Sequence, residues 1–327
     1  MRTRAKASAP AKVILLGEHF VVHGAPALAL AIDKRATATA DFRADSKIFI
    51  KSRAMKASGY FEGDRFHVEE GAEEAKKRLE PIHAVAKSLL GRSGKHLGVN
   101  IEIDSSIPVA AGLGSSAAVA VASTTALDYL LEIGLSRDEV FETAFNAEKI
   151  VHGTPSGIDP AIAIYGGVIQ YAKGGRIEPL DVKIDLPLVV GDTRKERSTG
   201  EMVARVNDLR RRYPSIVGSM IEACGKIVTR SIEALRSGDL KTLGEMMDMD
   251  HALLYAVGVS CEPLERLVHA ARRAGALGAK LTGAGGGGCM IALTAPEKLK
   301  DVAEAIEKEG GEAFITNKTM DGVRIEE

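Results

Sequence analysis

The stretch that decides the fold is PVAAGLGSSAAVAVA, residues 108–122. Glycines permit a tight turn, serines can cap a helix, and the second half of the stretch is an unbroken run of helix formers. It therefore predicts a buried helix over residues 113–131 that begins at the serines. The first N–H groups of a helix lack partners within it and carry the positive end of its dipole, so such a terminus attracts phosphate. Two interpretations stay open, an anion site or a well-capped buried helix after a glycine turn.

The sequence on either side of this stretch indicates two parts. Short apolar or alternating runs make the first 52 residues mostly sheet, residues 97–107 add a strand, and residues 136–152 form a helix. Residues 73–92 have helical periodicity interrupted by Pro81. Long amphipathic helices then fill residues 199–274, with strands at 279–281, 289–293 and 313–316. We expect a boundary within residues 181–186, which divides the chain into domains 1–183 and 184–327.

Composition excludes several classes of protein. The 43 basic and 44 acidic residues leave a net charge of −1, which argues against a general binder of nucleic acid or membrane surfaces. The first apolar run is too short for a signal peptide, and no window reaches the length of a membrane span. Three cysteines without a CxxC pair indicate neither a disulfide framework nor a zinc site. These features predict a cytoplasmic protein.

Two glycine-containing patterns exclude common nucleotide folds. No GxxxxGK[ST] sequence is present, so the chain is not a P-loop protein. GAGGGG, residues 283–288, formally fits GxGxxG, but the strand-like CMIALT follows it where the dinucleotide fingerprint requires a helix. The glycines are better explained by backbone that passes close to a neighbour, such as the phosphate-bearing helix terminus, and a flexible hairpin is the alternative.

A third stretch, NAEKIVHGTPSGIDP, places two carboxylates around a tight turn. Glu148 lies near the end of a predicted helix, and Asp159 follows the turn. One carboxylate can hold a hard cation while the other contacts a substrate hydroxyl, as phosphoryl transfer requires. The alternative is a helix-face glutamate and a capping aspartate.

The N-terminal segment offers two further polar side chains. In HFVVH, His19 lies four residues before another histidine, but Gly24 and Pro26 end any helix there, and Glu18 stands outside the HExxH order. Zinc is therefore excluded, and His19 is interpreted as a hydrogen-bonding group. Lys12 is either a solvated lysine at a strand end or a charge that faces phosphate.

Four segments together resemble the GHMP kinases, the family that includes galactokinase, homoserine kinase, mevalonate kinase and phosphomevalonate kinase. They read PAKVILLGEHFVVHGAPALALAI, PVAAGLGSSAAVAVA, HGTPSGIDPAIAIYGG and KLTGAGGGGCMIAL, and they span residues 10–293. All three family motifs are present in order. GEHFVVHGAPALALAI and EKIVHGTPSGIDPAIAIYGG are most similar to the mevalonate kinase branch, in its compact archaeal form. Phe20 and Val21 stand where a galactokinase would carry its sugar signature.

The resemblance implies a role for each residue that matches a family motif. Lys12 and Asp159 match the catalytic pair. Glu148 and Ser116 match the magnesium ligands, with Ser115 as the alternative serine. The residues that match the ATP-phosphate site are Pro108, Ala110, Ala111, Gly112, Leu113, Gly114, Ser115 and Ser116. The residues that match the acceptor site are Glu18, His19, Thr193 and Arg197, with Arg197 as the partner of the acceptor's carboxylate.

The resemblance also implies a two-lobed fold and a reaction. An N-terminal α/β lobe of the kind found in a ribosomal-protein domain would join a ferredoxin-like α+β C-terminal lobe. ATP with Mg²⁺ and mevalonate would meet between them, and the product would be 5-phosphomevalonate of the isoprenoid pathway. Neither nucleic acid nor a membrane is an expected partner, whereas a homodimer is compatible with the family.

Three alternatives to this reaction stay open. The first is a GHMP kinase for phosphomevalonate or a homoserine-like alcohol. The second is an inactive regulator with the GHMP fold, and the third is a nucleotide-binding module of another family. The joint presence of Lys12, Glu148 and Asp159 argues against the inactive regulator, because such a protein has no chemical need for all three.

Overall fold

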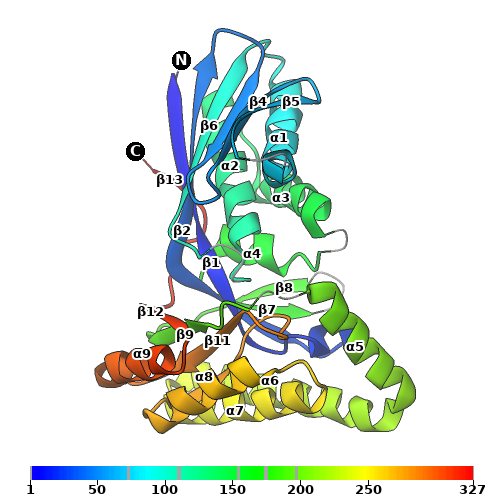
Figure 1. The fold of residues 1–327 in the computed structure, drawn as a ribbon, viewed down its shortest axis with the longest axis vertical. Helices are drawn as coiled ribbons and strands as arrows, with labels where there is room; N and C mark the ends of the chain where they lie inside the picture. Colours follow the sequence, from blue (N-terminus) through cyan, green and yellow to red (C-terminus); the bar gives the residue numbers. More distant parts are fainter. Residues whose placement is uncertain are drawn as a thin grey trace.

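A computed structural model describes residues 2–71, 74–108, 112–152, 155–172, 176–195 and 198–326, and it shows two bodies stacked along the long axis (Figure 1). Within these residues, one body is built on a nine-stranded sheet and the other on a four-stranded sheet. This confirms the two-lobed α/β and α+β fold that the sequence predicts. The division at residues 183 and 184 remains a prediction.

The larger sheet has the order β13-β1-β2-β6-β3-β4-β5, and β7 pairs with both β2 and β8. Its strands are β1 (Arg4–Leu16), β2 (Ala27–Arg43), β3 (Ile48–Ser52), β4 (Ala57–Glu62), β5 (Arg65–Glu70), β6 (Gly98–Ser105), β7 (Val168–Ala172), β8 (Arg176–Leu180) and β13 (Arg324–Glu326). The long antiparallel pair β1 and β2 runs from the top of this body down to the second one (Figure 1). The last strand, β13, returns from the second body to pair with β1.

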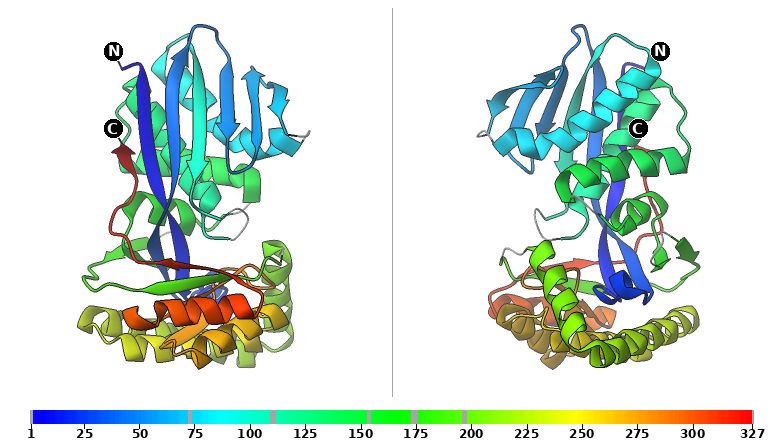
Figure 2. Two further views of the ribbon diagram at one scale, coloured as in Figure 1. Left: turned by 60° about the vertical axis from the view of Figure 1, so that its left-hand side comes forward. Right: turned by 90° about the vertical axis from the view of Figure 1, so that its right-hand side faces the viewer.

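Helices cover one face of this sheet (Figure 2). They are α1 (Glu74–Ser93), α2 (Ser115–Leu131), α3 (Arg137–His152) and α4 (Ile158–Tyr165). The predicted interruption of α1 at Pro81 is wrong, because the helix continues through this residue. Its apolar face, including Leu79, Val85 and Leu89, is buried, and this packing outweighs the roughly 3 kcal/mol that an interior proline costs.

The helix predicted from the opening stretch is α2, the central helix of this body. Most of its side chains are buried, and many of them are alanines. They share one core cluster with alanines of the two long strands, namely Ala7, Ala9 and Ala11 of β1 and Ala36, Ala38 and Ala40 of β2. Small side chains on both surfaces let the helix backbone lie close to the sheet, which fixes where the helix begins relative to β1.

The second sheet has the order β10-β11-β9-β12, and all of its pairs are antiparallel. Its strands are β9 (Leu188–Asp192), β10 (Gly278–Leu281), β11 (Cys289–Leu293) and β12 (Glu312–Thr316). The helices of this body are α5 (Thr199–Arg212), α6 (Pro214–Ser237), α7 (Leu240–Ala256), α8 (Glu262–Arg273) and α9 (Leu299–Lys308), and the short 3₁₀ helices of the chain are η1 (Phe20–His23) and η2 (Pro296–Lys298). In chain order, the helices α5 to α8 connect β9 to β10, β11 follows directly, and α9 connects β11 to β12. With α5 to α8 counted as one connection, this β-α-β-β-α-β order is that of the predicted ferredoxin-like lobe.

The two bodies meet where the lower end of β1 reaches β10. The hydroxyl of Thr282, directly after β10, accepts from the N–H of Ile14 at 2.9 Å and donates to the carbonyl of the same residue at 3.0 Å. A side chain of the second body thus continues the hydrogen bonding of a strand of the first. None of the described helices is both long and apolar enough to cross a bilayer.

Candidate active site

The N-terminus of α2 has no side-chain cap among the described residues. The helix begins at Ser115, as predicted, but its N-cap is Gly114 in the left-handed conformation. The first turn carries no acidic residue. The serines, which could cap this helix, do not act as its N-cap, and Ser116 donates its hydroxyl hydrogen to Glu148. Helix N–H groups without a capping side chain favour the anion-site interpretation over the capped helix.

The turn before α2 lies directly on Lys12 of β1. The backbone N–H of Lys12 donates to the carbonyl of Leu113 at 2.9 Å. A Cβ on Gly114 would lie 2.8 Å from Cγ of Lys12, and the φ of Gly114 is +74°. Glycine is therefore required here for both its conformation and its size. The turn packs on the aliphatic part of the lysine, so the ammonium group lies beside the helix end.

Lys12 and Asp159 form an ion pair in which Asp159 is the more accessible residue. The Nζ of Lys12 lies 3.1 Å from Oδ1 of Asp159, and the two side chains are 6% and 32% exposed. Asp159 belongs to the first turn of α4, whose N-cap is Gly157. It is therefore not the capping residue of that helix, and its carboxylate faces the lysine. The exposed part of this carboxylate leaves room for a third group.

Glu148 and Ser116 form a second polar pair at the same helix end. Glu148 is buried in α3, and its Oε1 accepts the hydrogen of the Ser116 hydroxyl. A carboxylate and a hydroxyl are hard oxygen donors of the kind that Mg²⁺ prefers. Among the described residues, no group of three or more His, Cys, Asp or Glu side chains could form a metal cage. The pair therefore fits a Mg²⁺ ion that takes its other ligands from phosphate and water.

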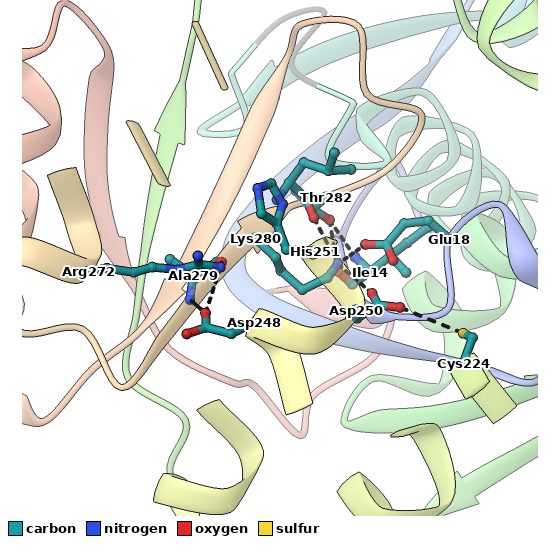
Figure 3. A network of polar contacts seen from close by, with 11 residues as sticks. Ile14, Glu18, Cys224, Asp248, Asp250, His251, Arg272, Ala279, Lys280 and Thr282 are labelled. Atoms are coloured by element: carbon teal, nitrogen blue, oxygen red, sulfur yellow. Dashed lines mark hydrogen bonds and ion pairs between the residues drawn. The ribbon is translucent and has the colours of Figure 1, made fainter. Parts of the chain in front are cut away.

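His19 and Glu18 follow β1 and contact the second body. The Nε2 of His19 lies 2.8 Å from the carbonyl of Ala284, in the glycine-rich loop. Because a carbonyl only accepts, this nitrogen carries the hydrogen. Glu18 does not face an open cleft: its side chain is 1% exposed and accepts from Nζ of Lys280 (Figure 3). A contact between Glu18 and the phosphoryl acceptor remains a prediction, and the burial of this side chain does not favour it.

Lys280 is a polar residue that our interpretation of the sequence did not assign. It lies in β10, and its side chain is fully buried. A signal was present, because this lysine interrupts the apolar pattern of a strand and directly precedes the LTGAGGGG segment. Fully buried lysines are rare unless they are paired.

The glycine-rich loop between β10 and β11 is held by backbone contacts. A Cβ on Gly287 would lie 2.6 Å from the carbonyl of Lys195, and one on Gly285 would collide with the carbonyl of Val259. The close-approach interpretation is therefore confirmed for these glycines, although the neighbours are these two segments and not the phosphate turn. The hydroxyl of Thr193 donates to the carbonyl of Gly288 at 2.8 Å. This residue, which was predicted to contact the phosphoryl acceptor, thus anchors the end of the loop.

The other residues predicted for the ATP-phosphate and acceptor sites are only partly described. Gly112 has a φ of +74°, and Leu113 beside it accepts from the backbone N–H of Lys12. Pro108 is the last described residue before the segment 109–111. Ala110, Ala111 and Arg197 lie outside the described residues. The structure thus brings Lys12, Asp159 and the turn together.

Comparison with known proteins gives a consistent result over the whole chain. The family models "GHMP kinases N terminal domain" and "GHMP kinases C terminal" match residues 80–167 and 231–312. The mevalonate kinase of Pyrococcus horikoshii is 45% identical over 98% of this chain and 97% of its own length. The crystal structure of L. major mevalonate kinase in complex with R-mevalonate superimposes with a TM-score of 0.84 at 29% identity, covering 97% of this chain and 96% of that one.

A second solved structure extends the comparison. The Methanococcus jannaschii mevalonate kinase matches with a TM-score of 0.82 at 26% identity, over 96% of this chain and 98% of that one. Both family models match, and the similar proteins cover nearly the whole chain. The chain belongs to the GHMP kinase family.

Proposed function

We propose that this protein transfers the γ-phosphoryl group of ATP to the primary hydroxyl of mevalonate, which gives 5-phosphomevalonate and ADP. The observation that carries the proposal is the Lys12 and Asp159 pair, 3.1 Å apart, beside the open N-terminus of α2. A full-length relative that is 45% identical and is a mevalonate kinase supports the choice of acceptor.

The residues of the site divide the work of phosphoryl transfer. The N–H groups at the start of α2 bind phosphate oxygens. Asp159 orients the hydroxyl and accepts its proton as the oxygen attacks the γ-phosphorus and the bond to the β-phosphate breaks. Lys12 stabilises the negative charge on the attacking oxygen and the transferred group, and because it is almost fully buried, water screens that interaction weakly.

Ser116 and Glu148 are the residues that would hold Mg²⁺. The ion, when bound, neutralises charge on the β- and γ-phosphates. Glu148 is buried, so an unpaired carboxylate here would be costly, and the hydroxyl of Ser116 contributes one hydrogen bond toward satisfying it. The same two side chains thus form a preformed site for a cation at the helix end.

The acceptor side of the site is proposed from fewer contacts. His19 and Thr193 both bond to the glycine-rich loop, which places them at its two ends. Arg197 is proposed as the partner of the acceptor's carboxylate, because a guanidinium binds a carboxylate through two parallel hydrogen bonds.

A coupled assay of ADP release tests the proposed function. Mevalonate, phosphomevalonate, homoserine and galactose are each supplied with Mg-ATP, and we expect mevalonate to give the highest kcat/KM. Higher turnover with one of the other alcohols would identify a different GHMP kinase. ATP binding without turnover on any of the four would support the inactive regulator.

Two further proposals concern the state of the protein in the cell. We place it in the reducing cytoplasm, because its three cysteines, Cys224, Cys261 and Cys289, lie far apart in the sequence and include no CxxC pair. A homodimer is proposed from the family resemblance alone, and sedimentation equilibrium would test it.

A further inference from the structure

We propose that Glu18, Lys280 and Asp250 form a buried positioning cluster that locks the loop after β1 onto β10, and that this contact sets the place of His19 in the acceptor site. The inference rests on the proposed function for its substrate. We call these three residues the buried triad. They come from the loop after β1, from β10 and from α7, and they lie at the centre of the network in Figure 3.

The Lys280 ammonium group lies among three oxygen atoms of the protein. The Nζ bonds to Oε1 of Glu18, donates to the carbonyl of Leu281 at 2.8 Å, and lies at an ion-pair distance of 3.2 Å from Oδ2 of Asp250. Two carboxyl groups and a carbonyl of the protein thus surround this cation. Lys280 is also 0% exposed. Its role is therefore internal, unlike that of Lys12.

The triad joins segments that carry predicted site residues. Glu18 directly precedes His19, and Lys280 lies two residues before Thr282, which bonds to Ile14 of β1. His19 in turn contacts the carbonyl of Ala284. Strand β1 and the loop after it are thus joined to β10 and the segment after it at three points. Of these three contacts, the one between Glu18 and Lys280 is the ion pair.

Buried charge makes this contact selective for one register. If the loop after β1 moved by one residue, Glu18 would leave the lysine, and two groups that carry or share charge would be buried without their partner. Such a loss is much more costly than the loss of an apolar contact of the same size. The triad therefore favours one position of the loop, and a residue attached to that loop is held within a narrow range.

A second set of contacts on β10 provides a control. Asp248 of α7 accepts from the N–H of Ala279 at 2.8 Å, and Arg272 of α8 donates to the carbonyl of Ala279 at 2.7 Å (Figure 3). Asp248 and Arg272 also pair with one another at 2.8 Å. Asp248 therefore holds β10 from α7, as Asp250 does, but its contacts are not made with Glu18. Removing Asp248 should weaken β10 without releasing the loop that carries His19.

The experiment compares Lys280→Met with Asp248→Ala in the full-length protein. For Lys280→Met we expect the KM for mevalonate to rise about tenfold or more while the KM for ATP stays within about twofold, because the acceptor side alone is misplaced. For Asp248→Ala both KM values should stay near wild type. An unchanged KM for mevalonate in Lys280→Met, or an equal rise in Asp248→Ala, would overturn the proposal.

A second measurement does not depend on activity. Hydrogen exchange of the amides of residues 17–24, without any ligand, should be at least about tenfold faster in Lys280→Met than in wild type and unchanged in Asp248→Ala. Equal exchange in both variants would contradict the positioning role. If wild type does not phosphorylate mevalonate, the proposed function fails, whereas this measurement still tests the triad.

Two substitutions of Asp250 serve if Lys280→Met does not fold. Asp250→Asn keeps an oxygen atom beside the ammonium group of Lys280, so loop exchange and the KM for mevalonate should stay close to wild type. Asp250→Ala removes that oxygen, and both quantities should rise. Identical behaviour of these two variants would refute a positioning role for the triad.

Discussion

Two clusters of lysine and carboxylate lie at the junction of the bodies, and they differ in exposure. In the first, Lys12 is 6% exposed and its partner Asp159 is 32% exposed. In the second, Lys280 and Asp250 are 0% exposed and Glu18 is 1% exposed. A ligand can reach one carboxylate in the first cluster and none in the second. The same pair of residue types can thus serve chemistry in one place and the position of a loop in the other.

The two clusters also differ in charge, because they differ in burial. Removal from water raises the pKa of Glu18 to about 8, although Lys280 opposes this. Burial lowers the pKa of Lys280, but Glu18 and Asp250 more than offset this and leave it raised. Near neutral pH Glu18 therefore holds a proton, which removes one negative charge from the triad. A sealed cluster favours neutrality, whereas the open pair can lend its charge to a reaction.

Asp159→Asn tests the open cluster and should give the largest effect. The substitution keeps the size of the side chain but removes its charge and its capacity to accept a proton. We expect kcat to fall on the order of 10²–10⁴-fold while ATP binding and the melting temperature change little. Steady-state kinetics and a thermal melt on one preparation check this. A near-normal kcat with a lowered melting temperature would assign Asp159 a structural role.

Lys280→Met should show the opposite pattern in stability. It leaves the buried carboxyl groups of Glu18 and Asp250 without their cation, and breaking a buried pair in this way costs about 3–5 kcal/mol. The free energy of unfolding, measured with urea, should fall by this order. Lys12→Met is the matched substitution in the open cluster. We expect a smaller loss of stability there, because Asp159 is part-exposed and water can solvate it. A larger loss in Lys12→Met would reverse the comparison.

Glu148→Gln tests whether the pair of Glu148 and Ser116 at the start of α2 binds a cation as part of the open site. The amide keeps an oxygen that can accept from Ser116 but lacks the charge that attracts a cation. The magnesium concentration needed for half-maximal rate should rise on the order of 10–100-fold, with the KM for mevalonate nearly unchanged. A magnesium titration at saturating ATP measures this. A titration curve identical to wild type would show that Glu148 is not a ligand.

The sequence predicted local features better than long-range ones. The glycine turn, the start of α2 and three of the four strands of the second sheet, namely β10, β11 and β12, all follow from turn residues and periodicity, so they were predicted to within about two residues. The continuous course of α1 through Pro81 was not predicted, because tertiary packing decides it. The ion pair between Lys12 and Asp159 joins residues far apart in the chain, and only the family resemblance had grouped them.

The buried triad shows the limit of the sequence most clearly. Glu18, Asp250 and Lys280 come from three segments, and no spacing rule connects them. Glu18 stands in a recognisable motif, and this led to its assignment as a substrate contact. Whether an acidic residue faces a ligand or a lysine depends on which strand lies beside it, and that depends on the packing of two bodies.

The smallest expected effect is a pH dependence that comes from the triad alone. The folded-state pKa of Glu18 is about 8, above its ordinary value of 4.5, so the folded protein binds this proton more tightly than the unfolded chain. The stability that it contributes is therefore full below pH 4.5 and is lost as the pH rises toward 8. Between pH 6.5 and 8 the loss should be on the order of 1–2 kcal/mol.

Few neighbouring groups interfere in this window. Lys280 stays charged, and burial raises the pKa of Cys224, so this thiol stays protonated. Burial lowers the pKa of His251 to about 4, so the stability that this histidine costs at low pH is regained as the pH passes its ordinary value of 6.5. The part regained above pH 6.5 is small, and it is the same whichever residue stands at position 18. Glu18→Gln matches the protonated glutamate in shape and cannot titrate. Urea unfolding at pH 6.5 and pH 8 should therefore show a larger decline in stability for wild type than for Glu18→Gln. Parallel declines would mean that Glu18 has already lost its proton below pH 6.5, and that this carboxylate is charged at neutral pH in spite of its burial.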